Sequence, residues 1–407
     1  MMNFKKAAEI LRNSDGFLVV SHYDCDGLSS AAVLSETLRR LEKDFELKIV
    51  KRLPAELPES EVTVFADLGS GYLDWVSSLP GKKLVLDHHD VRGSGNVLHL
   101  NPKLSGSSMS ASAVCYLVAR EFGFRDLSVP ALVGSLGDLE KPPRIILEDA
   151  SDFGVRVRPA LRLFGNRRPV HKTLEYSFSP FIPGITGNES AAVQFLSDLG
   201  IPVRTGTKWR TLADLSEAEV VRLADGLARL GVEPLEFRPE LNGADLRETA
   251  TVVNACGRLG EYETGIRISL SGCPVRGEEI MKRYRKLIAS CVSWVRRPEN
   301  VARKTADYVF GKNFIPDTVI GTVVSMCVKS GILGPVAVGF AEDGDGVKVS
   351  ARSLRGRISD AVYRACSELG GSGGGHEHSA GGFIPSGTEE KFVEIFENLI
   401  RFINVKR

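Results

Sequence analysis

Histidine and aspartate follow the first apolar run of the chain at a spacing that suits metal binding. The segment His22-Tyr-Asp24-Cys-Asp26 comes directly after the run 17–21. Residues two apart share one face of an extended chain, so these three side chains converge without long-range help. Gly27 then permits a turn into the next segment. One imidazole and two carboxylates held together in this way favour a divalent cation.

The same residue types recur after two later apolar runs and at the end of a Gly-Ser-Leu-Gly segment. They are Asp67, Asp87, His88, His89 and Asp138. Any one of these aspartates alone would be interpreted as a turn or helix-cap residue, but their joint occurrence favours a metal site. The set contains no thiolate, which suits Mn²⁺, Mg²⁺ or Fe²⁺ and weakens a structural zinc interpretation. Two divalent ions would offset four carboxylates, and two ions about 3.5–4 Å apart are typical of sites that hydrolyse phosphoesters.

The elements that position these residues alternate between strand and helix patterns. Apolar runs of strand length occur at 17–21, 48–51, 62–66 and 83–86, and a helical pattern covers 29–41. This alternation predicts βαβ units and a parallel sheet. The carboxyl ends of parallel strands meet along one edge, where ligands bind, so we expect the aspartates and histidines to meet there.

The motifs SHYDCDG, FADLG, VLDHH and SLGD resemble motifs I to IV of the DHH phosphoesterase superfamily. That superfamily includes RecJ exonucleases, nanoRNases, cyclic-dinucleotide phosphodiesterases and family II pyrophosphatases. RecJ itself usually has Asp where His22 stands, and either residue can bind a metal. The resemblance implies two divalent ions, with Mn²⁺ favoured and Mg²⁺ as the alternative. It implies that one ion is held by His22, Asp24 and Asp67, and the second by Asp26, Asp67, His88 and Asp138.

The resemblance also implies two catalytic residues within the Asp-His-His run. His89 would face the scissile phosphate. Asp87 would fix an imidazole in place, as carboxylates that support metal sites do.

A glycine-rich segment near the C-terminus is the second strong signal. The run Gly373-Gly374-Gly375-His376 predicts a loop whose backbone N–H groups approach a phosphate, with His376 able to donate a hydrogen bond or carry a proton. The chain has no GxxxxGK[ST] motif, so an ATP-binding loop is not supported. The segment resembles the GGGH motif of the DHH-associated C-terminal domain of RecJ and nanoRNases. Arg352 and Ser353 resemble the strand of that domain that holds substrate phosphate, and the motif argues against a pyrophosphatase.

The rest of the chain completes the predicted organisation. Residues 146–305 have mostly helical patterns, and strand signals return at 319–328, 335–340 and 347–351, followed by helices at 357–369 and 388–403. We predict an α/β protein with an N-terminal parallel-sheet DHH domain and a smaller C-terminal α/β domain across a cleft. The predicted parts are a DHH domain with helical extension at 1–205, a helical connector at 206–305 and the substrate-binding domain at 306–407.

Composition limits the class of protein. The chain has 407 residues, a net charge of +1 and 43% hydrophobic residues, which excludes a disordered chain and a strongly basic histone-like binder. We find no apolar run long enough for a membrane span and no secretory signal. The seven cysteines are widely spaced without a CxxC pair, which favours reduced thiols and a cytoplasmic location.

Two basic segments could contact nucleic acid. Residues 282–304 carry eight Lys and Arg against one acid, interleaved with Tyr284 and Trp294, and residues 156–172 carry six with no acid. Such segments can follow a phosphate backbone while aromatic rings stack on bases. The alternative is a solvated helix face, and a core position for Trp294.

The resemblance therefore implies a metal-dependent phosphodiesterase. The leading hypothesis is a RecJ-like exonuclease that hydrolyses single-stranded DNA or RNA to 5′-mononucleotides through a water activated by two metals. The additional residues near 205–305 favour it over a small-substrate phosphodiesterase, such as a nanoRNase, pAp phosphatase or cyclic-dinucleotide hydrolase. A replisome scaffold is the third hypothesis. We expect single-stranded nucleic acid or short oligonucleotides, and replication or repair proteins, as partners. Cleavage polarity, DNA or RNA preference and oligomeric state stay open.

Overall fold

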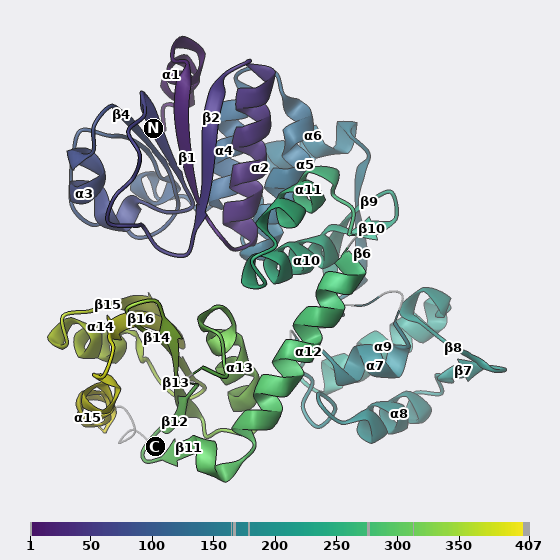
Figure 1. Ribbon diagram of the computed structural model, residues 1–407. Helices are drawn as coiled ribbons and strands as arrows, with labels where there is room; N and C mark the ends of the chain where they lie inside the picture. The colour runs from purple at the N-terminus through teal and green to yellow at the C-terminus, as the bar shows by residue number, and fades with distance from the viewer. Residues whose placement is uncertain are drawn as a thin grey trace. The chain divides into compact units, whose positions relative to one another are not determined.

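The computed structural model of the protein describes residues 2–163, 165, 168–177, 180–274, 277–311 and 313–401 (Figure 1). The chain divides into two compact units, Met1–Ala160 with Glu236–Lys282 and Leu161–Leu235 with Arg283–Arg407. In the part that is described, no helix combines the length and apolarity needed to cross a membrane. All seven cysteines have free thiols.

The first unit is built on a parallel sheet, as the alternation of strand and helix patterns predicted. Its strands are β1 (Gly16–His22), β2 (Asp44–Val50), β3 (Val62–Ala66), β4 (Lys82–Leu86) and β5 (Leu98–Leu100). Their order is β2-β1-β3-β4-β5, and each neighbouring pair is parallel. Because β3 is buried along its whole length, it has no polar alternation and shows in the sequence as a continuous apolar run.

Helices cover both faces of this sheet (Figure 1). One face packs against α2 (Cys25–Arg40) and α4 (Ala111–Arg120), which in turn contact α5 (Ser128–Gly137). On the other face, α3 (Leu73–Ser78) closes a core that includes Leu18, Phe65 and Val85. The remaining helices of this part are α1 (Phe4–Asn13), which packs on α4, and α6 (Arg144–Asp152), which packs on α5.

A second segment of the chain completes the first unit. It contributes α10 (Leu246–Arg258) and α11 (Tyr262–Ser271), which pack against α2 and α5. A small sheet has the strand order β10-β9-β6 and consists of β6 (Val155–Leu161), β9 (Leu235–Leu241) and β10 (Ala244–Asp245). The mostly helical pattern predicted for 146–305 is therefore wrong at these strands. Their charged and proline residues interrupt the apolar alternation that marks a strand.

The second unit begins with a helical part, residues 161–235. It contains α7 (Val170–Glu175), α8 (Glu189–Asp198), α9 (Glu217–Arg229) and the short hairpin β7 (Arg204–Thr205) and β8 (Lys208–Trp209). Helix α9 begins at a capping box in which Ser216 and Glu219 bond reciprocally to each other's backbone N–H groups. The buried Glu219 also accepts two hydrogen bonds from Arg210, which ties the preceding turn to the helix.

The C-terminal part of this unit is a mixed sheet. Its strands are β11 (Val301–Arg303), β12 (Asp307–Phe310), β13 (Val336–Asp343), β14 (Gly346–Ser353), β15 (Ser372–His376) and β16 (Ser379–Pro385). Their order is β11-β12-β13-β14-β16-β15. The helices are α12 (Glu278–Val295), α13 (Asp317–Lys329), α14 (Ser359–Glu368) and α15 (Glu389–Ile400). One apolar cluster joins α12 and α13 to the sheet, and another joins α14 and α15 to it.

Two predictions for this part are wrong. Residues 319–328 are helical, in α13, although they are rich in valine and isoleucine. Their apolar side chains pack on β13, and this tertiary contact outweighs the strand preference of β-branched residues. The glycine-rich segment is not a loop but the antiparallel pair β15 and β16. Glycines fit there because an added Cβ at Gly382 would lie 2.4 Å from the Cys366 sulfur on α14.

Candidate metal centre

The structure gathers the predicted ligands at the carboxyl edge of the parallel sheet. His22 ends β1, Asp67 directly follows β3, and Asp87 to His89 follow β4. Asp138 caps the C-terminal end of α5. All of these residues stand at the ends of strands or helices. The parallel sheet aligns the ends of its strands at one edge, and this brings the residues together.

The loop after β1 is fixed by local contacts. Asp24 is the N-cap of α2, and its Oδ1 accepts the Gly27 N–H at 3.0 Å. At Gly27 an added Cβ would lie 2.2 Å from the His22 carbonyl oxygen, so only glycine fits this close approach. Asp26 is fully buried, and its two oxygens accept the N–H groups of Ala111 and Ser112 at the start of α4.

Three groups of potential ligand atoms form at the site: the first is His22, Asp24 and Asp67, the second Asp26, His88 and Asp138, and the third Asp67, His88 and His89. His22 Nδ1 lies 3.0 Å from Asp24 Oδ2 and 3.3 Å from Asp67 Oδ2. His88 Nε2 lies 3.4 Å from Asp67 Oδ1, so the two carboxylate oxygens of Asp67 face different imidazoles. In the second group, His88 Nε2 also lies 3.1 Å from Asp138 Oδ2 and 3.9 Å from Asp26 Oδ2. Within each group the ligand atoms are all within 4.8 Å of one another.

These residues fit divalent cations. Both carboxylate oxygens of Asp67, Nδ1 of His22 and Nε2 of His88 are buried without a hydrogen-bond partner in the part of the chain that is described. Buried polar atoms are normally satisfied, so four unsatisfied atoms in one cluster indicate a binding site. The Asp67 backbone adopts a φ of 60°, which is uncommon for a residue other than glycine and occurs at functional sites.

The electrostatics agree with this fit. Burial raises the pKa of Asp26 well above its usual value, and the charges of Asp67 and Asp138 raise it further. Burial also raises the pKa of Asp67, and the carboxylate of Asp24 adds to this effect. Packed carboxylates resist ionisation together unless cations neutralise them.

His89 has different surroundings from His88. Its Nδ1 lies 2.7 Å from Asp87 Oδ1, and 56% of its side chain is exposed. Burial opposes the charged imidazole, but the hydrogen bond with Asp87 outweighs it and raises the pKa of His89 to about 9. Asp87 is itself fully buried, and its other oxygen accepts the Ser70 N–H at 2.9 Å. Asp87 thus orients His89, whose side chain is more than half exposed.

Sequence analysis did not identify two residues that support this arrangement. The buried Asn101 donates from Nδ2 to the His89 carbonyl oxygen and to Ser70 Oγ, each at 2.9 Å. Asn101 follows β5, so its place at a strand end is the signal that could have identified it. Ser70 shows no comparable sequence signal. Its role depends on hydrogen bonds with three segments that are distant from it in the sequence.

The predicted substrate-binding residues gather in the second unit. Strand register aligns Arg352 on β14 with Ser379 on β16, and Ser379 with His376 on β15, so Arg352 and His376 flank the same position. The Arg352 guanidinium donates to the Ala351 carbonyl oxygen at 2.8 Å. Gly374 and Gly375 precede His376 on β15, and the side chain of His376 lies outside the described part of the structure.

Ser353 is occupied by a local turn. Its buried Oγ accepts the N–H groups of Arg355 and Gly356 at 3.2 and 3.1 Å. This contact stabilises the chain just after Arg352.

The two basic segments differ in their surroundings. On α12, Lys282, Arg283, Arg285 and Lys286 are exposed, whereas Trp294 packs beside the second-unit core and stacks on Phe314. In residues 156–172, Arg162 pairs with Glu233 and Lys172 pairs with Glu189. Arg167 in that segment lies outside the described residues. Lys282 also lies 4.0 Å from Glu279, and Arg156 and Arg158 are exposed, so both segments combine exposed basic side chains with ion pairs.

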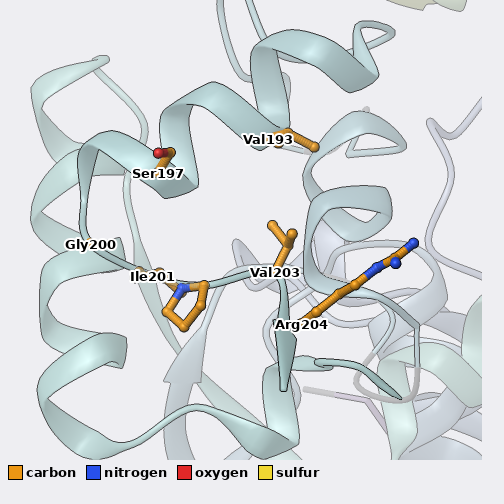
Figure 2. Close-up of a pocket in the computed structure, with 7 residues that line it drawn as sticks. Val193, Ser197, Gly200, Ile201, Val203 and Arg204 are labelled. Atoms are coloured by element: carbon orange, nitrogen blue, oxygen red, sulfur yellow. The ribbon is translucent and has the colours of Figure 1, made fainter. Parts of the chain in front are cut away.

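A pocket of about 490 Å³ lies in the second unit, and none of the predicted site residues lines it (Figure 2). It is lined by α8 and the following segment, including Val193, Ser197 and Val203. At its rim, Arg204 stacks over the ring of Trp209 at 3.6 Å. The lining is mainly apolar and contains no titratable cluster, so we assign it no chemistry.

Three family models match the chain. The DHH family N-terminal domain matches residues 16–134, the DHH-CID domain matches 163–234 and the DHHA1 domain matches 304–404. An uncharacterized protein of Methanocaldococcus jannaschii, MJ0831, is 29% identical over 428 residues, which cover 97% of this chain and 96% of that protein.

Solved structures share the fold at low identity. RecJ from Thermus thermophilus in complex with Mn²⁺ has a TM-score of 0.60 at 18% identity over 98% of this chain, which spans only 55% of that RecJ chain. An exonuclease RecJ bound to manganese has a TM-score of 0.55 at 17% identity, covering 98% of this chain and 94% of that one. CDC45 from Entamoeba histolytica has a TM-score of 0.65 at 8% identity, covering 97% and 98%.

These matches and the site define an α/β protein with the fold of RecJ, combining a parallel-sheet domain with a mixed-sheet domain. The chain carries the DHH N-terminal, DHH-CID and DHHA1 domains in this order, as a member of the DHH superfamily.

Proposed function

We propose that the cluster around Asp67 binds two divalent metal ions. His22, Asp24 and Asp67 hold the first ion, and Asp67 bridges to the second. The second ion is held by Asp26, Asp67, His88 and Asp138. Mixed imidazole and carboxylate ligands favour Mn²⁺, with Mg²⁺ as the alternative. The observation that carries this proposal is Asp67, whose two buried oxygens lack hydrogen-bond partners among the described residues and face the His22 and His88 imidazoles.

The reaction we propose is hydrolysis of a phosphodiester in single-stranded DNA or RNA, releasing 5′-mononucleotides from an end. When bound, the two ions would activate a water and stabilise the charge on the phosphoryl oxygens. His89, oriented by Asp87, contacts the scissile phosphate. Arg352 and the backbone of Gly374 and Gly375 hold the phosphate of the terminal nucleotide, with His376 beside them and Ser353 keeping the turn after Arg352 closed.

The exposed charges of α12 favour a long strand over a dinucleotide as the substrate. Four basic side chains lie within five residues of α12, and such a group can neutralise several phosphates of a strand, which a dinucleotide does not have. A complete ligand set favours catalysis over a scaffold without activity. We further propose a cytoplasmic location and replication or repair proteins as partners, for which the reduced cysteines and the CDC45-like fold are the support.

A digestion assay tests this function. The protein is incubated with Mn²⁺ and end-labelled 5-mers and 30-mers of DNA and RNA, beside its Asp67→Asn variant. Asparagine tolerates the positive φ of this position but removes the bridging charge. We expect shortening of single strands from one end, and a loss of about a thousandfold or more in the variant, because metal stabilisation is worth several kcal/mol. Cleavage of 5-mers with no effect of length would replace the exonuclease with a small-substrate phosphodiesterase, and no cleavage would favour the scaffold.

A further inference from the structure

Helix α10 contacts the metal-binding loop from a distant part of the sequence. Oδ1 of Asn254 accepts the N–H of Cys25 at 3.0 Å, across 229 residues. Cys25 lies between the two aspartates of the loop, Asp24 and Asp26. It is also the first residue of α2, so its N–H has no acceptor within the helix. Asn254 supplies the acceptor that this end of α2 needs.

A second contact lies one turn further along α10. At Gly257, an added Cβ would lie 1.8 Å from the carbonyl oxygen of Tyr23. Tyr23 separates His22 from Asp24, so the helix backbone lies directly against the peptide that links these two residues. No side chain fits between them, so the backbone of α10 packs directly on this loop.

The neighbouring helix α11 extends this contact along α2. Ser269 Oγ lies 2.8 Å from Ser29 Oγ, and both are buried. A Cβ at Gly265 would lie 2.8 Å from a methyl group of Leu28. The pair α10 and α11 therefore packs closely on the first two turns of α2, all within the first compact unit. These helices lie beyond residues 16–134, which match the DHH family N-terminal domain.

We propose that α10 is a brace of the metal centre and that Asn254 is a positioning residue, acting through the Cys25 peptide on the carboxylates of Asp24 and Asp26. This inference rests on the proposed two-metal site. Without the Asn254 acceptor, the first peptide of α2 loses its hydrogen bond to α10, and the separation of the two carboxylates is less tightly restricted. Groups that orient metal ligands typically change metal affinity by about 10–100-fold.

The test is Mn²⁺ titration calorimetry on the full chain stripped of metal. Asn254→Ala removes the acceptor, and Asn254→Asp keeps an accepting oxygen at the same place. Thr251→Ala is the matched control, because Thr251 is exposed on the same helix and its hydroxyl donates to the Arg247 carbonyl oxygen within that helix. We expect two ions in the wild type and the control, binding weakened about 10–100-fold in Asn254→Ala, and affinity within about threefold of wild type in Asn254→Asp.

The thermal midpoint of the metal-free protein separates positioning from folding. It should be the same in Asn254→Ala as in Thr251→Ala. If Asn254→Ala lowers the thermal midpoint, Asn254→Leu is used in its place, because leucine fills the same volume without a hydrogen-bond acceptor. Two ions bound by Asn254→Ala with wild-type affinity would overturn the brace and leave the proposed function intact. A wild type that binds no Mn²⁺ would overturn both.

Discussion

At the scale of single residues, His88 and His89 are neighbours with different tasks. His88 Nε2 is buried among the carboxylates of Asp67 and Asp138, whereas the exposed His89 is hydrogen-bonded to Asp87. We expect His88→Ala to weaken Mn²⁺ binding, because it removes a ligand. His89→Ala should keep both ions and lower kcat by about 10²–10³-fold, as loss of a group acting on the transition state does.

Metal content and turnover of the two variants check this division. Inductively coupled plasma analysis after Mn²⁺ loading gives the ions per chain, and steady-state digestion gives kcat. Asp87→Asn is the companion variant, and it should resemble His89→Ala because His89 loses its orienting charge. Equal metal loss in the two histidine variants would contradict the assignment.

The sequence predicted the site residues that follow strand ends, and missed those whose role depends on tertiary contact. His22 ends an apolar strand, and Asp67 and Asp87 follow apolar strands, so their convergence could be foreseen from the parallel sheet. Asn254 lies in the middle of a helix and acts on a residue 229 positions away. Local patterns carry no information about such a partner.

At the scale of elements, the glycine-rich pair β15 and β16 owes its composition to the helix beneath it. A Cβ at Gly382 would lie 2.4 Å from the Cys366 sulfur and 2.9 Å from the Ser372 carbonyl oxygen. We expect Gly382→Ala to lower the free energy of unfolding by about 1–3 kcal/mol through overpacking. Urea denaturation, followed by circular dichroism, measures this change.

The adjacent glycine is the control for that prediction. A Cβ at Gly381 would meet only the Val349 carbonyl oxygen, at an ordinary 3.5 Å. Gly381→Ala should therefore leave stability unchanged or raise it by about 0.4–1 kcal/mol, because alanine restricts the unfolded chain. Equal destabilisation by the two substitutions would show that β16 needs glycine for its backbone rather than for space.

A buried carboxylate joins α4 to α6 and makes stability depend on pH. Asp149 on α6 accepts hydrogen bonds from Tyr116 and Arg120 at 2.5 Å and from Arg125 at 2.7 Å. Burial alone would raise the pKa of Asp149, but these bonds lower it to about 2. A lowered folded-state pKa means that the stabilisation is complete above the unfolded value of about 4 and is lost as pH falls toward 2.

The Asp149→Asn variant measures this contribution. We expect it to lose roughly 2 kcal/mol of unfolding free energy at pH 7, which corresponds to the pKa shift. The difference from wild type should persist at pH 5 and shrink between pH 4 and pH 3. Denaturation with EDTA present keeps the metal centre out of the comparison. A difference that stays constant down to pH 3 would contradict the role assigned to the charged carboxylate.

Strands and helices were predictable from the sequence where the local apolar pattern and the tertiary packing favour the same conformation. The runs 17–21, 62–66 and 83–86 lie within β1, β3 and β4. The run 319–328 has the composition of a strand but forms the helix α13. Its apolar side chains pack on the face of the C-terminal sheet, against β13 and β14. Here the tertiary environment decided between two conformations that the local sequence permits.

At the scale of the whole molecule, the chain leaves the first unit and returns to it. Residues 161–235 and 283–407 form the second unit, and Glu236–Lys282 adds α10 and α11 to the first. The chain crosses between the units at 160/161, 235/236 and 282/283. Contacts distant in sequence alone define them, which is why they could not be read from periodicity.

The basic surface of α12 should matter for long substrates and not for short ones. Arg285 and Lys286 are exposed on this helix. We expect the Arg285→Gln/Lys286→Gln variant to bind 30-mers more weakly. The salt dependence of binding should also fall, by about 0.7 in slope for each phosphate that the variant no longer neutralises. Hydrolysis of a dinucleotide should not change.

Fluorescence anisotropy across a salt series measures that slope. Lys5→Gln/Lys6→Gln on α1 removes the same charge from another exposed helix and serves as the control. Equal weakening by both variants would indicate a nonspecific effect of net charge. If the Arg285→Gln/Lys286→Gln variant lost activity equally on dinucleotides and on 30-mers, the small-substrate phosphodiesterase would be favoured.

The most direct test of the two-metal centre is anomalous diffraction from Mn²⁺-soaked crystals. We predict two peaks about 3.5–4 Å apart on either side of Asp67. The first should lie among His22, Asp24 and Asp67, and the second among Asp26, Asp67, His88 and Asp138. A single peak with tetrahedral ligands, or no peak at these side chains, would contradict the two-metal centre.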